Sequence, residues 1–231
     1  MQVHEQLLDT PPEPLKAMLR QFCIVVVFSI AFAYIEAAVV VYLRTIFHSS
    51  GFTFPLTEFG IGPLWKQLLL IETSRETATL VLIFTGSWLF GRNLQQRFAF
   101  FLTIFAVWDI FYYIWLKVLI DWPASIIDWD VLFLIPTVWA GPVVAPILIS
   151  LTLLVFAVII LYRSCRARVL RLTPIDWFAF IAATLVVVAS FCIAGLHVAE
   201  PDFQSHFHWL LFAAGLLSTI ALFAKCLLKS K

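Results

Sequence analysis

Three ionisable side chains interrupt a long apolar run in the first third of the sequence. The run reads "LLLIETSRETATLVLIF" and contains Glu72, Arg75 and Glu76. Glu72 and Glu76 are four residues apart, so they would share one face of a helix, with Arg75 one position away. Two more carboxyl groups, Glu36 and Asp109, also stand within apolar runs. Carboxyl groups in such surroundings serve as general acids or bases, as cation ligands or as partners of a basic side chain.

The run that holds Asp109 carries further polar groups at helical spacing. Tyr113 and Lys117 follow Asp109 in successive steps of four residues, and Tyr112 stands three residues on. They belong to the densest aromatic patch of the chain, "VWDIFYYIW". If a helix bundle brings these groups together, the expected catalytic residues are Glu36, Arg75, Glu76, Asp109 and Tyr113. Substrate contacts are then expected from Glu72, Tyr112, Lys117 and Trp108.

The charges of these groups do not balance. Four carboxyl groups face two basic side chains, Arg75 and Lys117, which leaves two negative charges if all groups are ionised. Because unpaired charge is costly to bury, some carboxyl groups must be protonated, bind a cation or reach water. An ion-pair network that only locks helices together is the structural alternative, but it leaves two carboxylates without a basic partner.

A divalent metal is the one cofactor that these residue types suggest. Carboxylates and imidazoles can hold Mn, Fe, Zn or Cu, and the candidate ligands are Glu36, Glu76, Asp109 and His197. The spacing contains no HxxxH or ExxH pair, and the four cysteines form no CxxC motif. Metal binding therefore stays one alternative among several.

The composition defines the surroundings in which these groups must work. The chain has 231 residues, of which 62% are hydrophobic and 13% charged, and its mean hydropathy is +0.99. A soluble domain carries about a quarter charged residues. The sequence therefore predicts a multi-pass integral membrane protein of a bacterial-type plasma (inner) membrane, with a single polytopic domain over residues 1–231.

Six apolar segments are long enough to cross a bilayer, whose core of about 30 Å needs about 20 helical residues. An all-α bundle of six transmembrane helices is therefore expected, over residues 22–43, 68–90, 98–120, 142–162, 175–196 and 207–228. Residues 1–20 are expected to be irregular or interfacial. The segment before the fourth helix, Val131 to Ala140, contains Pro136 and is followed by Gly141 and Pro142. Because proline and glycine break a helix, this segment is expected to be re-entrant or interfacial.

The basic residues predict the orientation. If both termini are cytoplasmic, eleven of the fifteen Lys and Arg residues lie on the inside, most densely in the loop 163–174. Residues 44–63 then form an outer loop, and the carboxyl groups at membrane depth lie in the outer halves of their helices. Nothing beyond these topology charges suggests nucleic-acid binding.

Three functions fit this pattern. The first is a membrane-embedded enzyme that acts on a lipid or other hydrophobic substrate at the outer leaflet. The second is a proton- or cation-coupled transporter, in which the carboxyl groups would be ion sites and the proline-interrupted segment a gate. The third is a non-catalytic subunit of a larger membrane complex. Expected partners are membrane lipid, a hydrophobic small molecule or a cation, and further copies of the chain or other subunits.

Overall fold

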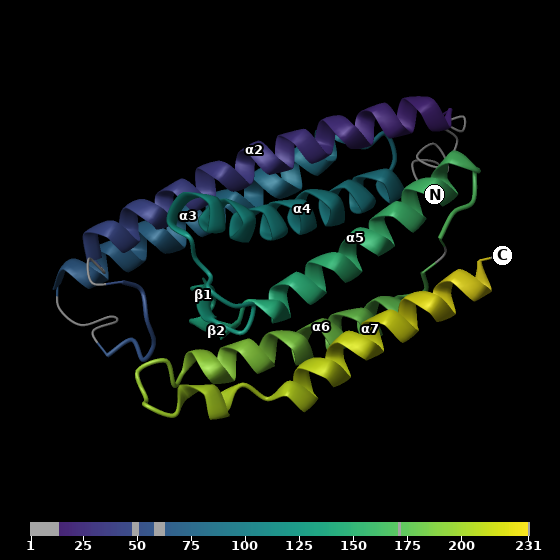
Figure 1. The fold of residues 1–231 in the computed structure, drawn as a ribbon. Coiled ribbons are helices and arrows are strands. Elements are labelled where there is room, and N and C mark those ends of the chain that lie inside the picture. Colours follow the sequence, from purple (N-terminus) through teal and green to yellow (C-terminus); the bar gives the residue numbers. More distant parts are fainter. Residues whose placement is uncertain (1–13, 48–50, 58–62, 171, 231) are drawn as a thin grey trace.

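A computed structural model describes residues 14–47, 51–57, 63–170 and 172–230 of the chain. Six long helices run roughly along one axis, with a small β-hairpin between the third and fourth of them (Figure 1). In chain order the elements are α2 (Leu15–Phe47), α3 (Pro63–Phe90), α4 (Leu94–Ile120), β1 (Trp129–Phe133), β2 (Trp139–Pro142), α5 (Val144–Cys165), α6 (Pro174–Gly195), the 3-10 turn η1 (Phe203–His206) and α7 (Trp209–Lys229).

Each of the six helices expected from hydropathy is present. Five of them, α2, α4, α5, α6 and α7 with η1, are long and apolar enough to cross a membrane. The sixth, α3, is the helix that carries Glu72, Arg75 and Glu76. The chain is therefore a multi-pass integral membrane protein. The first helix begins at Leu15, seven residues before the expected start at residue 22, so residues 15–20 are helical; residues 1–13 lie outside the described part.

Polar caps and tight turns fix the helix ends. The Asn93 side chain accepts a hydrogen bond from the Gln96 amide and so caps the start of α4. The start of α6 has a reciprocal capping box, in which the Thr173 hydroxyl and the Asp176 carboxylate each accept a bond from the other's backbone amide. Such caps satisfy amide donors that have no partner within the helix. They set where each helix leaves the apolar layer.

The bundle has two parts that meet at the hairpin. Helix α4 packs against α2, α3 and α5, whereas α6 and α7 pack on each other. The α6–α7 pair contacts the rest mainly through β2, with a small number of residues between α5 and α7 and a ring contact of 5.8 Å between Phe98 of α4 and Trp177 of α6. The N-terminal end of α2 and the C-terminal end of α7 lie at the same end of the molecule (Figure 1). We call this the termini end and the opposite one the hairpin end.

The segment before α5 is an antiparallel hairpin. Asp130 pairs with Gly141 and Val131 with Ala140, with an irregularity between Val131 and Phe133. Two glycines let the hairpin lie directly on α6. A Cβ on Gly195 would stand 1.8 Å from the Val138 carbonyl oxygen, and one on Gly141 would stand 2.9 Å from the Phe191 ring. This close contact holds the two parts of the bundle together at the hairpin end, and α5 starts at Val144, just after the expected residue 142.

Candidate functional site

Arg75 joins two carboxylates from different helices. Its guanidinium forms an ion pair with Glu36 of α2 and another with Glu72 of α3, the latter at 2.8 Å. The Thr79 hydroxyl, one turn after Arg75, donates to Glu36 at 3.2 Å. The expected convergence of Glu36, Glu72 and Arg75 is therefore present. The positive charge of Arg75 is shared by two acids and is not available to an anionic ligand.

Glu76 and Asp109 have only neutral hydrogen-bond donors among the described residues. Glu76 accepts a bond of 2.8 Å from the backbone amide of Leu134, which follows β1. Asp109 of α4 accepts a bond of 2.7 Å from the Ser150 hydroxyl of α5. Both carboxyl groups are buried. Neither of them forms an ion pair with a basic side chain in the described part of the chain, which leaves them available for a proton or for a bound polar group.

A second buried ion pair lies nearby and was not expected from the sequence. Arg44, at the end of α2, binds Asp130 of β1 at 2.8 Å, and the Tyr112 hydroxyl donates to the same carboxylate at 3.4 Å. The Arg44 guanidinium also lies over the rings of Phe52 and Trp122, at 4.1 and 3.8 Å. This pair ties the hairpin to α2. The two residues are far apart in sequence, so helical spacing gives no sign of it.

Lys117 lies apart from the carboxyl groups. It binds Asp121, just beyond the end of α4, at 2.7 Å, and both side chains are exposed. The hydrogen bond and charge of Lys117 lower the pKa of the Asp121 carboxyl below its ordinary value. The cluster of Glu36, Glu72, Arg75, Glu76 and Asp109 therefore contains four carboxyl groups and one guanidinium, which pairs with two of them. The charge imbalance exceeds the one counted from the sequence. We call these five residues the acidic cluster.

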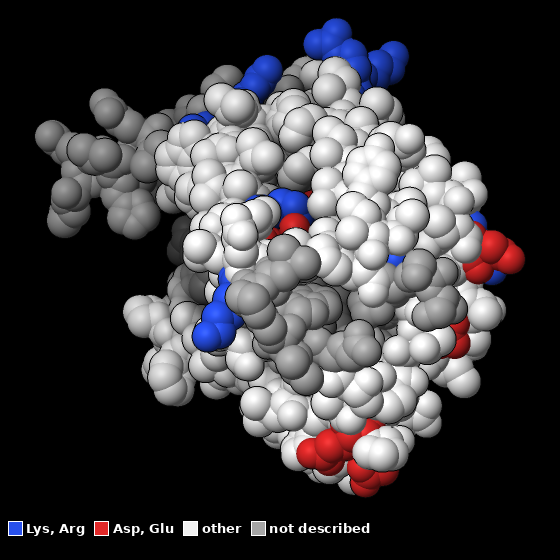
Figure 2. All heavy atoms as spheres, turned by 90° about the vertical axis from the view of Figure 1, so that its left-hand side faces the viewer, with Lys and Arg blue, Asp and Glu red and all other residues white. Residues whose placement is uncertain are grey.

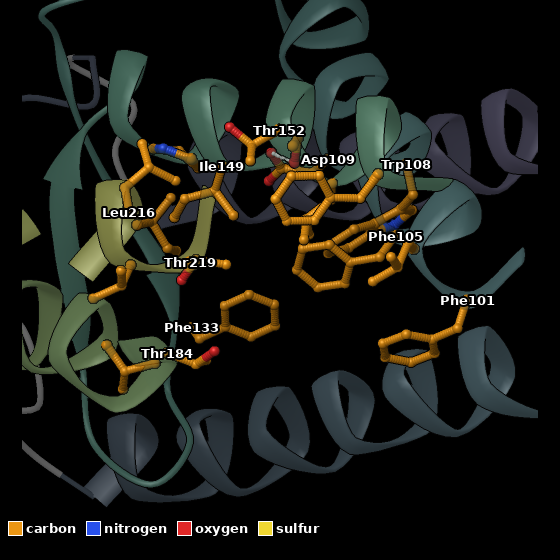
Figure 3. A pocket seen from close by; sticks show the side chains of 18 of the residues that line it. Phe101, Phe105, Trp108, Asp109, Phe133, Ile149, Thr152, Thr184, Leu216 and Thr219 are labelled. Atoms are coloured by element: carbon orange, nitrogen blue, oxygen red, sulfur yellow. Dashed lines mark hydrogen bonds between the residues drawn. The ribbon is translucent and has the colours of Figure 1, made fainter. Parts of the chain in front are cut away.

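A cavity of about 540 Å³ extends from the acidic cluster along the inside of the bundle. Phe101, Phe105 and Trp108 of α4 form one side of it, and Thr184 of α6 with Leu216 and Thr219 of α7 lie opposite (Figure 3). Its polar lining at the hairpin end comes from Glu36, Arg75, Glu76, Asp109, Tyr112 and Tyr113. Most of the remaining lining is apolar. Seven of the nine expected catalytic and substrate residues thus line one cavity, and Glu72 contacts it through Arg75.

Four polar side chains on the cavity lining have a buried atom without a hydrogen-bond partner in the described chain. One atom is Nη1 of Arg75, which is ion-paired with Glu36, and the other three belong to neutral groups. They are the Trp108 and Trp139 indole nitrogens and the Tyr113 hydroxyl. Trp108 and Tyr113 are only 6% and 4% exposed. A buried donor without a partner costs about 1–3 kcal/mol. Such groups are typical of a site that a ligand or water completes.

The four candidate metal ligands do not come together. Within the described ranges, the group of ligand atoms close enough to share an ion is His197, Glu200 and His206, whose ligand atoms all lie within 4.8 Å of one another. Glu200 contacts His197 at 2.8 Å and His206 at 3.2 Å. This group lies in the loop between α6 and α7 at the hairpin end, where the surface is mostly uncharged and acidic side chains gather at the edge (Figure 2). His197 is thus separated from the acidic cluster and joined to two residues that the sequence did not single out.

No family model, curated protein or solved structure matches the chain. The fold and the site together define a polytopic membrane protein with buried carboxyl groups. Chemically, the arrangement offers proton transfer at Glu76 or Asp109, next to an apolar space of the size that ligand pockets have.

Proposed function

We propose that the protein is a membrane-embedded enzyme that acts on a lipid or another long apolar molecule. The observation that carries this proposal is a cavity that joins an apolar channel to buried acids in a multi-pass membrane protein. A substrate would place its tail among Phe101, Phe105 and Phe156 and its polar end beside Asp109. Burial of the tail would supply affinity, and the acids would supply the chemistry.

The dimensions of the cavity support a lipid-like substrate. Its lining follows α4 from Phe98 to Tyr113, roughly 22 Å at 1.5 Å per helical residue, and the mostly apolar part from Phe98 to Asp109 spans roughly 16 Å. This apolar part is about half of a bilayer core of about 30 Å. Several residues of α4 and α6 both line the cavity and are exposed, including Phe98, Trp177 and Leu185, so acyl chains would contact them where the cavity opens. A molecule from one leaflet could enter sideways between these helices.

The acid–base role falls to Asp109. It sits at the polar end of the cavity and its hydrogen bond comes from the neutral Ser150, so its carboxyl can give or take a proton at the substrate's polar end. Glu36 and Glu72 form ion pairs with Arg75, and Thr79 donates a hydrogen bond to Glu36. These groups would therefore have a positioning role beside the cavity. Glu76 fixes the hairpin through Leu134 and faces the same cavity.

The proposed orientation has both termini in the cytoplasm and the acidic cluster toward the outer leaflet of a bacterial-type plasma membrane. The support is the charge distribution: the termini end carries Arg20, Arg92, Arg163, Arg168 and Lys229, and the hairpin end carries exposed acids. In this orientation α3 is the sixth membrane helix. The hairpin then lies at the outer side, at the depth of the helix ends.

A divalent metal, if the protein uses one, would bind at His197, Glu200 and His206 in this proposal. Two imidazoles and one carboxylate are a ligand set that zinc uses, with ligand atoms about 2.0–2.2 Å from the ion. Elemental analysis of purified wild type should then find metal that His206→Ala removes and His208→Ala retains, since His208 is exposed and outside the group. Equal metal content in wild type and His206→Ala would contradict this assignment.

The enzyme proposal is tested by comparing lipids before and after incubation with the protein. Protein reconstituted into vesicles of total lipid from its source cells should change the mass of at least one lipid species. Asp109→Asn should abolish the change, whereas Lys117→Met, on the same helix but outside the cavity, should retain it. If wild type leaves every lipid mass unchanged but moves a lipid between leaflets, the protein is a carrier and the enzyme proposal is wrong.

A further inference from the structure

We propose that the polar end of the molecule bound in the cavity is an uncharged oxygen group, a hydroxyl or a carbonyl, and not a phosphate or carboxylate. This inference rests on the proposed cavity function and names the chemical class of the ligand. It follows from two independent features of the cavity, its charges and its unpartnered hydrogen-bond donors.

The charged groups that line the cavity disfavour a ligand whose polar end is an anion. Arg75 is the one basic side chain among the described residues that line the cavity, and it is already bound by Glu36 and Glu72. Arg44, the nearest other guanidinium, is bound by Asp130. The remaining ionisable lining groups are acids or tyrosines, and none of them adds positive charge in any protonation state. An anion placed here would be buried without a counter-charge, which is costly in an apolar medium.

The unpartnered donors require an acceptor. Trp108 and Tyr113 flank Asp109 on α4, one residue before it and one turn after it, and Trp139 stands opposite on β2. The rings of Trp108, Phe133 and Trp139 form a continuous row, with centroids 6.3 and 5.4 Å apart. Indole N–H groups only donate, and a phenol donates as well as accepts. A ligand oxygen beside Tyr113 or one of the indoles would satisfy a donor that the protein itself leaves unsatisfied.

A hydroxyl satisfies both kinds of group at once. It can accept from Tyr113 or an indole and donate to the Asp109 carboxyl. A carbonyl accepts from the same donors and places its oxygen where a proton from Asp109 would arrive. An ammonium group could only donate, and it would leave the three donors without a partner. The unpartnered donors and the absence of a free counter-charge therefore both favour an uncharged oxygen at the polar end of the ligand.

The test uses two probes with the same tail. Protein in lipid nanodiscs is photolabelled with a long-chain alcohol that carries a diazirine in mid-chain, and labelled peptides are identified by mass spectrometry. Unlabelled oleyl alcohol and oleyl phosphate then compete, each dosed as a mole fraction of the nanodisc lipid. We expect labelling on α4 and α6, and competition by the alcohol at least about tenfold stronger than by the phosphate.

Tyr113→Phe tests the donors. The Tyr113 hydroxyl makes no hydrogen bond within the described protein, so its removal should leave folding intact. It should weaken alcohol competition about 3- to 10-fold, the worth of one hydrogen bond, while Tyr42→Phe on the exposed face of α2 should change nothing. Equal or stronger competition by the phosphate, or an unchanged Tyr113→Phe, would overturn the inference and leave the cavity function standing. Labelling that misses both α4 and α6 would instead refute the cavity function itself.

Discussion

Replacement of Arg44 by methionine should destabilise the protein strongly, because it strands a buried carboxylate. Asp130 is 2% exposed and Arg44 is 9% exposed, and their side chains meet at 2.8 Å. Removal of one partner of a buried pair costs about 3–5 kcal/mol. Methionine keeps the apolar stem but also removes the cation–π contacts with Phe52 and Trp122, so a rescue variant is needed to isolate the stranded charge. The free energy of unfolding is measured by equilibrium titration with SDS in mixed micelles, followed by tryptophan fluorescence.

The same chain offers a matched control and a rescue. Lys117→Met breaks an exposed pair, whose side chains are 49% and 90% accessible, and should cost much less than Arg44→Met because water screens the charges. Asp130→Asn added to Arg44→Met removes the stranded charge and should recover part of the loss, with a coupling of about 0.5–3 kcal/mol. Two results would show that the buried pair does not hold the hairpin to α2. One is a loss of unfolding free energy in Arg44→Met no larger than in Lys117→Met. The other is a loss in the double variant equal to the sum of the losses in Arg44→Met and Asp130→Asn.

Three further outcomes are expected. Gly195→Ala should cost about 3 kcal/mol in unfolding free energy, because the new Cβ would stand 1.8 Å from the Val138 carbonyl oxygen. The control Gly86→Ala, whose new Cβ would have neighbours at 3.5 Å or more, should be neutral or up to about 1 kcal/mol stabilising. Equal effects of the two substitutions would contradict the close contact between the hairpin and α6. Thr173→Ala should cost about 0.5–2 kcal/mol through loss of its capping box with Asp176, read from the SDS midpoint, and no shift would refute the cap. A C-terminal fluorescent protein should be bright and a C-terminal alkaline phosphatase inactive, and the reverse result would invert the proposed orientation.

The helices were predictable from the sequence because their signal is local. Hydropathy and length found all six, with ends within a few residues for α4 to α7. The start of α2 differs from the expected residue 22 because the helix continues beyond the apolar run, through Lys16 and Arg20, whose side chains are exposed. A charged residue marks where apolar surface ends, which is not always where the backbone hydrogen bonds end.

The hairpin and its contacts depend on long-range packing that no spacing rule reports. Val131 to Ala140 is apolar except for Thr137, so it shows no alternation of polar and apolar faces that would reveal a strand. The bond from Leu134 to Glu76 and the pair of Arg44 with Asp130 join residues 58 and 86 positions apart. These contacts exist because the hairpin folds back between the helices, which only the three-dimensional arrangement shows.

Part of the acidic cluster was predictable, and Lys117 shows the limit of the method. The i+3 pairing of Glu72 with Arg75 follows from helix geometry and is present. Lys117 was grouped with Asp109 through two steps of four residues. Each such step turns about 40° around a helix of 3.6 residues per turn, so two steps turn about 80°. Lys117 therefore points away from the Asp109 face and binds Asp121.

The most direct test of the central claim, that the cavity holds a lipid-like molecule, is an experimental structure of the protein in lipid nanodiscs. The account predicts elongated density between α4 and α6 that runs along Phe101 and Phe105 and ends beside Asp109. It also predicts that this end lies within hydrogen-bond distance of the Tyr113 hydroxyl. Contact between α6 and α4 that closes the space, or a cavity that contains only water beside the acidic cluster, would contradict the claim.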